Sequence, residues 1–82
     1  MVEALDDPIE VEVHFGPRGM RPLWFAWQGR RRLVRQITCA WQERDGLLVH
    51  RYFTVSDGDT IYELRFDARA LRWHLTKVAL EG

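Results

Sequence analysis

The clearest pattern of strands and turns in the chain lies in residues 47–78, LLVHRYFTVSDGDTIYELRFDARALRWHLTKV. Two strand-like segments, 47–55 and 60–67, flank the sequence Ser-Asp-Gly-Asp at 56–59, in which aspartate and glycine favour a tight turn. Tyr62, Leu64 and Phe66 alternate with polar residues, so they fall on one face of the second segment. This pattern predicts a β-hairpin with an apolar inner face.

Residues 67–70 form a second turn signal, and a further strand is predicted after it. In residues 71–80, Leu71, Trp73 and Leu75 alternate with polar or charged side chains. We therefore expect these three apolar side chains on the inner face of the last strand.

The N-terminal half of the chain has the same period of two. In residues 8–15 the apolar positions are Ile9, Val11, Val13 and Phe15. Residues 16–19, Gly-Pro-Arg-Gly, form a turn signal, and the aromatic-rich residues 22–28 suit a pleated strand better than a helix. A hairpin turn at Gln28 and Gly29 ends this strand.

Residues 30–43 are compatible with two structures. An amphipathic helix would place one apolar stripe at Leu33, Val34, Ile37, Ala40 and Trp41. A strand would place Leu33, Ile37, Cys39 and Trp41 on one face, with a bulge to accommodate Arg35. Turn signals on both sides of the segment, at 28–29 and 44–46, favour a long bent strand.

Together these segments predict an all-β fold in a single domain, residues 1–82. We expect a small antiparallel meander of five or six strands, because the strands are short and joined by tight turns. A sheet this small must curl to bury its apolar face and shield its edges, so we expect a curled sheet or a partly open barrel. Trp27, Trp41 and Trp73 are expected to fill the interior, which disfavours a small-molecule pocket there. Whether residues 1–7 are ordered is left open.

Composition narrows the class of protein. The chain has 82 residues, 46% of them apolar, and a formal net charge of zero, which excludes a disordered tail. No apolar run approaches the roughly 20 residues of a membrane span, and the acidic N-terminus lacks the pattern of a signal peptide. The single cysteine, Cys39, cannot form an internal disulfide. We therefore expect a soluble cytoplasmic protein that does not contact membranes.

The sequence offers little for metal binding or for catalysis. His14, His50 and His74 are predicted on outward positions of three strands, with no spacing that brings them together, and are expected to be solvated. Cys39 lies in mid-strand without a local partner, where a thiol usually fills the core. We predict neither a metal site nor a nucleophile here.

Paired carboxylates do not change that conclusion. Asp57 and Asp59 belong to a turn sequence, and a calcium loop needs several more oxygen ligands. Without a glycine-rich phosphate loop, no cofactor is expected either. The prediction is a protein that is not an enzyme.

A basic hairpin is the feature that most suggests a function. Residues 16–42 contain six arginines and no acid, so their guanidinium groups repel one another unless a polyanion or distant acids compensate. Aromatic side chains on outward positions would add a stacking platform for unpaired bases. The predicted site for single-stranded nucleic acid consists of Arg30, Arg31, Arg32, Arg35, Trp24 and Tyr52.

A protein-interaction module is the alternative. Residues 1–15 carry five acids and no Lys or Arg. Glu10 and Glu12 are predicted to face outward, and they would pair with the arginine hairpin of a neighbouring copy. A homodimer of this kind accounts for zero net charge with separated signs better than nucleic acid does, because an acidic strand repels phosphate.

Residues 22–78 also resemble a known family. The similar features are PLWFAWQGR at 22–30, Trp41, RYFTV at 51–55, IYELRFD at 61–67, and Trp73, Leu75 and Val78. They resemble a little-characterised family of small bacterial all-β domains, found alone or near the C-terminus of Y-family polymerase-like mutagenesis proteins. Members often have an aromatic after the hairpin arginines, where this chain has Leu33. The resemblance implies a β domain and a DNA-processing protein as partner, but it implies no catalytic residue.

Overall fold

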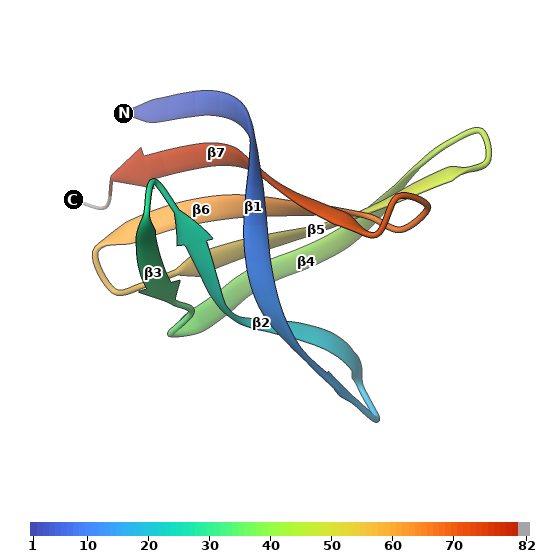
Figure 1. Cartoon of the computed structure of the whole chain (residues 1–82), viewed down its shortest axis with the longest axis horizontal. Coiled ribbons are helices and arrows are strands. Elements are labelled where there is room, and N and C mark those ends of the chain that lie inside the picture. The colour runs from blue at the N-terminus through green and yellow to red at the C-terminus, as the bar shows by residue number, and fades with distance from the viewer. Residues whose placement is uncertain (81–82) are drawn as a thin grey trace.

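The protein is all-β, as predicted. A computed structural model describes residues 1–80 and contains one antiparallel sheet of seven strands in the order β3-β2-β1-β7-β6-β5-β4 (Figure 1). The strands are β1 (Val2–Gly16), β2 (Gly19–Trp27), β3 (Arg30–Leu33), β4 (Gln36–Asp45), β5 (Leu48–Ser56), β6 (Thr60–Asp67) and β7 (Arg72–Leu80). The sheet consists of two meanders, β1 to β3 and β4 to β7, which are joined by pairing of β1 with β7.

Residues 30–43 form strands rather than a helix, but they form two strands instead of one. The turn before them has positive φ at both Gln28 (53°) and Gly29 (71°), which is the geometry of a tight hairpin. Val34 still donates its backbone N–H to Leu23 of β2, whereas Arg35 donates to Ser56 of β5. The chain therefore changes partners between these two residues, and this split raises the strand number from the expected five or six to seven.

The long first strand curls the sheet. β1 has 15 residues; its first half pairs with β7 as far as Ile9, and its second half pairs with β2 from Glu10 onward. Register shifts in each half, at 4–7 and at 12–13, are the kind of irregularity that bends a strand. Figure 1 shows β1 running beside β7 and then turning across the sheet to meet β2. The sheet is curled but not closed, because β3 and β4 remain unpaired with each other.

The core lies between the two meanders. Its buried apolar side chains come from β2, β5, β6 and β7 and are Phe25, Phe53, Val55, Tyr62, Leu64, Trp73 and Leu75. Phe25 of β2 meets Tyr62 of β6 edge to face, with ring centroids 5.0 Å apart, although these strands are not neighbours in the sheet. The inward positions predicted for Tyr62 and Leu64 are confirmed, and burial of this apolar surface is the main stabilising term.

Three side chains predicted to lie inside are exposed. Cys39 is exposed, and Trp41 retains 36% of its accessible surface. A register shift between Ile37 and Cys39 places Cys39 and Trp41 on the outer face of β4, a strand that has a neighbour on one side only. Leu71 is 76% exposed because it lies in the turn before β7, with a positive φ of 54°.

Candidate functional site

The predicted nucleic-acid site does not form one surface. Because side chains alternate along a strand, the three consecutive arginines of β3 are divided between its two faces. Arg31 pairs with Ala26 and shares the outer face of the β2–β3 hairpin with Trp24, whereas Arg32 pairs with the buried Phe25 and points inward. Tyr52 lies on β5, in the other meander.

Arg32 is part of the interior. Its Nη1 donates a hydrogen bond of 3.1 Å to the Tyr62 hydroxyl, and its guanidinium lies 4.9 Å from the centre of the Trp27 ring. The Tyr62 hydroxyl in turn donates to Asp57 at 3.1 Å, and the Trp27 indole N–H donates to Asp7 at 3.0 Å. Burial raises the pKa of Asp57, but hydrogen bonds from the backbone and from Tyr62 outweigh burial and lower that pKa below its ordinary value. The expectation that the whole arginine cluster faces water is therefore wrong for Arg32.

Arg31 and Trp24 form a cation–π pair. The Arg31 guanidinium carbon lies 3.9 Å from the centre of the Trp24 ring. One face of this indole is therefore already covered by the protein itself. The stacked guanidinium keeps its N–H donors at the surface, where an acceptor can reach them.

The acidic N-terminal segment does not neutralise the exposed arginines. Glu10 is separated from Arg31 by the intervening Ala26, and the two side chains form no ion pair. Within residues 1–80, the ion pairs join Arg65, Lys77, His50 and His74 to Asp6, Glu63 and Asp67. Arg30, Arg31 and Arg35 take part in none of them. We refer to the exposed side chains of these three arginines as the arginine surface.

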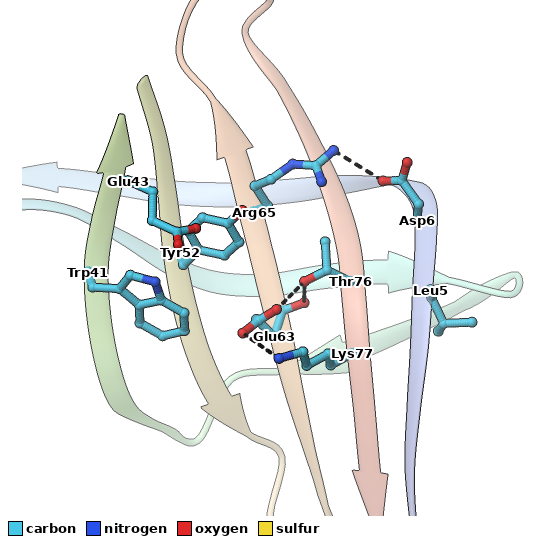
Figure 2. Close-up of a pocket in the computed structure, with 9 residues that line it drawn as sticks. All are labelled: Leu5, Asp6, Trp41, Glu43, Tyr52, Glu63, Arg65, Thr76 and Lys77. Atoms are coloured by element: carbon cyan, nitrogen blue, oxygen red, sulfur yellow. Dashed lines mark hydrogen bonds and ion pairs between the residues drawn. The ribbon is translucent and has the colours of Figure 1, made fainter. Parts of the chain in front are cut away.

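A second polar surface covers the outer face of β4 to β7. It contains a cavity of about 450 Å³ lined by Leu5, Asp6, Trp41, Glu43, Tyr52, Glu63, Arg65, Thr76 and Lys77 (Figure 2). Trp41 and Tyr52 stack nearly parallel, with ring centroids 5.1 Å apart and an interplanar angle of 4°. Burial and the neighbouring Glu43 carboxylate raise the pKa of the Tyr52 phenol. Tyr52 thus belongs to a carboxylate-rich surface and not to the arginine surface.

Asp67 organises the same outer face. Arg65 Nε lies 3.0 Å from its Oδ1, His50 Nδ1 lies 2.5 Å from the same oxygen, and His74 Nδ1 lies 3.4 Å from Oδ2. Burial alone would raise the pKa of Asp67. The hydrogen bonds from His50 and Arg65 outweigh burial and lower that pKa below its ordinary value. The expectation that the histidines are solvated and far apart is wrong for His50 and His74, which are half-buried around one carboxylate.

Sequence reasoning missed this cluster although a signal was present. The turn at 56–59 fixes the register of the β5–β6 hairpin, in which His50 pairs with Asp67 and Tyr52 pairs with Arg65. Within the described residues, no group of three or more His, Cys, Asp or Glu side chains is placed to hold a metal ion.

Comparisons with known proteins add no family. No protein-family model matches the chain, and no curated protein or solved structure is significantly similar to it. Residues 1–80 contain no helix that is long and apolar enough to span a bilayer. The resemblance to small bacterial β domains stays a prediction.

Proposed function

We propose that this chain is a non-enzymatic binding module that contacts single-stranded nucleic acid through the arginine surface. The observation that carries the proposal is that Arg30, Arg31 and Arg35 are exposed and make no ion pair with any carboxylate of residues 1–80. Three unpaired guanidinium groups on adjoining segments suit a row of phosphates, whose counterions are released on binding. The family resemblance is the reason for placing this activity in a cytoplasmic accessory of bacterial DNA metabolism.

The shape of the arginine surface favours a strand of nucleic acid over a folded duplex. β3 is an edge strand that pairs only with β2, so Arg30 and Arg31, although they project from opposite faces, both flank its open edge. Arg31 is held in place by Trp24, which lowers the entropy lost when its donors engage a phosphate. Arg32 and Tyr52 are left out of the proposed contact, because the first is bound internally and the second lies among carboxylates.

The test is binding of a fluorescein-labelled oligothymidylate over a series of salt concentrations. We expect affinity to fall steeply with salt, and the double variant Arg30→Ala, Arg31→Ala to reduce the salt slope by about 1.4, since each lost single-strand phosphate contact accounts for about 0.7. Arg69→Ala is the matched control, because Arg69 is exposed in the turn between β6 and β7. Binding that is independent of salt, or that is weakened equally by the control, would contradict the proposal.

Homodimerisation is the second candidate, and one observation favours it. Glu10 and Glu12 are exposed on β1 and belong to no ion pair of the described chain, so their carboxylates are free to meet the arginine surface of another copy. Sedimentation at several concentrations tests this candidate. We expect Glu10→Arg to abolish association if it is correct, and a monomer at every concentration would exclude it.

A further inference from the structure

The strand β4 presents an open edge. It runs over ten residues, Gln36–Asp45, and every residue except Ile37 is exposed. It pairs with β5 on one side, and no strand of residues 1–80 pairs with its other side. The bulge near Ile37 distorts the start of β4, but residues 39–45 keep a regular register with β5. A regular edge of this length offers backbone N–H and C=O groups to a further strand.

The outer face of this edge carries an aromatic ring beside a carboxylate. Trp41 and Glu43 lie two residues apart on β4, so both project to the outer face, as Figure 2 shows. Tyr52 of β5 covers one face of the Trp41 indole, and because β4 is the last strand of the sheet, no strand within 1–80 covers the other face. The Glu43 carboxylate makes no ion pair with any cation of the described residues.

The surrounding charges favour a cationic ligand. Of the two bases that line the cavity, Arg65 is paired with Asp6 and Asp67, and Lys77 lies 3.8 Å from Glu63. The Glu43 carboxylate is hydrogen-bonded to the Tyr52 phenol, but no cation of the described residues forms an ion pair with it. An anionic strand would be repelled here, whereas a guanidinium group can stack on an indole and also bind a carboxylate through two N–H donors.

We propose that the edge of β4 binds an extended, arginine-containing segment of a partner protein by strand addition. The backbone of the segment would pair with residues 39–45, and alternate side chains of an Arg-x-Arg pattern would reach Trp41 and Glu43 on the outer face. Arginine is preferred over lysine because the site combines a flat ring with a carboxylate.

A second copy of this chain fits the edge less well. In the pairable residues 39–45 the only base is Arg44, which pairs with Val49 and lies on the face opposite to Glu43. Self-pairing of β4 would therefore leave Glu43 without a cation. The Arg-x-Arg pattern of β3 does not fit either, because Arg32 is already bonded to Tyr62 inside the fold. This inference concerns a surface separate from the arginine surface and does not depend on nucleic-acid binding.

The experiment measures binding of a short fluorescein-labelled peptide that alternates arginine with valine to the full chain. We expect saturable binding, and a loss of affinity of about two- to fivefold in each of the variants Trp41→Ala and Glu43→Gln, as for an exposed cation–π contact or ion pair. Glu3→Gln, which removes an exposed carboxylate from β1, is the control and should bind as the unaltered chain does. Near-ultraviolet circular dichroism checks that each variant is folded.

Backbone pairing is tested with two N-methylated forms of the peptide, methylated at alternate amides in opposite phase. Only alternate amides of an added strand face the sheet, so one form should lose binding and the other should retain it. Equal binding of both forms, a lysine peptide that binds as tightly as the arginine peptide, or a control as weak as Glu43→Gln would overturn the proposal. Self-association of the chain that Trp41→Ala abolishes would also overturn it, because the edge would then be occupied by a second copy.

Discussion

Replacing Tyr62 by phenylalanine tests the polar network that joins β3 to the β5–β6 turn. The Tyr62 hydroxyl accepts a hydrogen bond from Arg32 and donates one to Asp57, each 3.1 Å long, while its ring is 2% exposed in the core. The substitution keeps the ring and removes only the oxygen. Within residues 1–80, Arg32 Nε is already buried without a hydrogen-bond partner, so losing the Tyr62 hydroxyl removes a hydrogen bond from a guanidinium that is already incompletely bonded.

The expected cost follows from the charges of the two partners. A hydrogen bond to a charged group contributes about 1.5–3 kcal/mol, but Arg32 and Asp57 are half-buried and regain some water when the hydroxyl is lost. We therefore expect Tyr62→Phe to lower the free energy of unfolding by about 2–3 kcal/mol at pH 7. That is a large part of the total, which is about 4–12 kcal/mol for a chain of this length.

The assay is urea unfolding followed by tryptophan fluorescence, with Tyr52→Phe as the matched control. Tyr52 is half-buried on the outer face, and loss of its hydroxyl should lower the free energy of unfolding by less than about 1 kcal/mol. A double-mutant cycle with Arg32→Met should give a coupling energy of at least about 0.5 kcal/mol, because the two residues share a bond.

Acidity provides an independent check on Tyr62→Phe. The pKa of Asp57 is lowered in the folded protein, so its stabilising contribution is present above its unfolded pKa and is lost as the pH falls through its folded pKa. The difference between Tyr62→Phe and the unaltered chain should therefore shrink in acid. A cost below about 0.5 kcal/mol at pH 7, or one that is unchanged in acid, would show that the hydroxyl does not stabilise Arg32 and Asp57 in the fold.

Three further predictions concern other parts of the molecule. Asp67→Asn should lower the free energy of unfolding by about 1.5–3 kcal/mol at pH 7 and by progressively less in acid, because bonds to His50 and Arg65 lower the pKa of Asp67. An equal loss at all pH values in urea unfolding would contradict this prediction. The Cys39 thiol is exposed and should react with a colorimetric disulfide reagent about as fast in the native protein as in urea, whereas reaction only after unfolding would place it in the core. Leu64→Ala should lower the free energy of unfolding by about 2–5 kcal/mol because Leu64 is fully buried. The control Leu47→Ala, at a 93% exposed position, should change it by less than about 0.5 kcal/mol. Similar losses for the two variants in denaturant unfolding would be inconsistent with this core.

Local patterns were sufficient for the turns and for most of the strands, but not for the break between β3 and β4. The turn at 56–59 is stabilised by its own side chain, because Asp57 accepts hydrogen bonds from the backbone N–H groups of Asp59 and Thr60. The same turn sets the β5–β6 register, so the pairing of His50 with Asp67 could have been predicted from the sequence. The candidate site was less predictable, because a run of arginines does not reveal which of them finds a partner far along the chain.

The all-β class, the positions of the turns and the inner faces of β6 and β7 can be predicted from local patterns, because each depends on residues close together in the chain. Two features are visible only in the folded chain: β4 lies at an edge, which leaves Trp41 and Cys39 exposed, and Arg32 reaches Tyr62, thirty residues away in sequence. Pairing between strands that are distant in sequence, such as β1 with β7, sets whether a strand lies at an edge and whether a side chain stays exposed or finds a partner. The local alternation of side chains carries no information about that pairing.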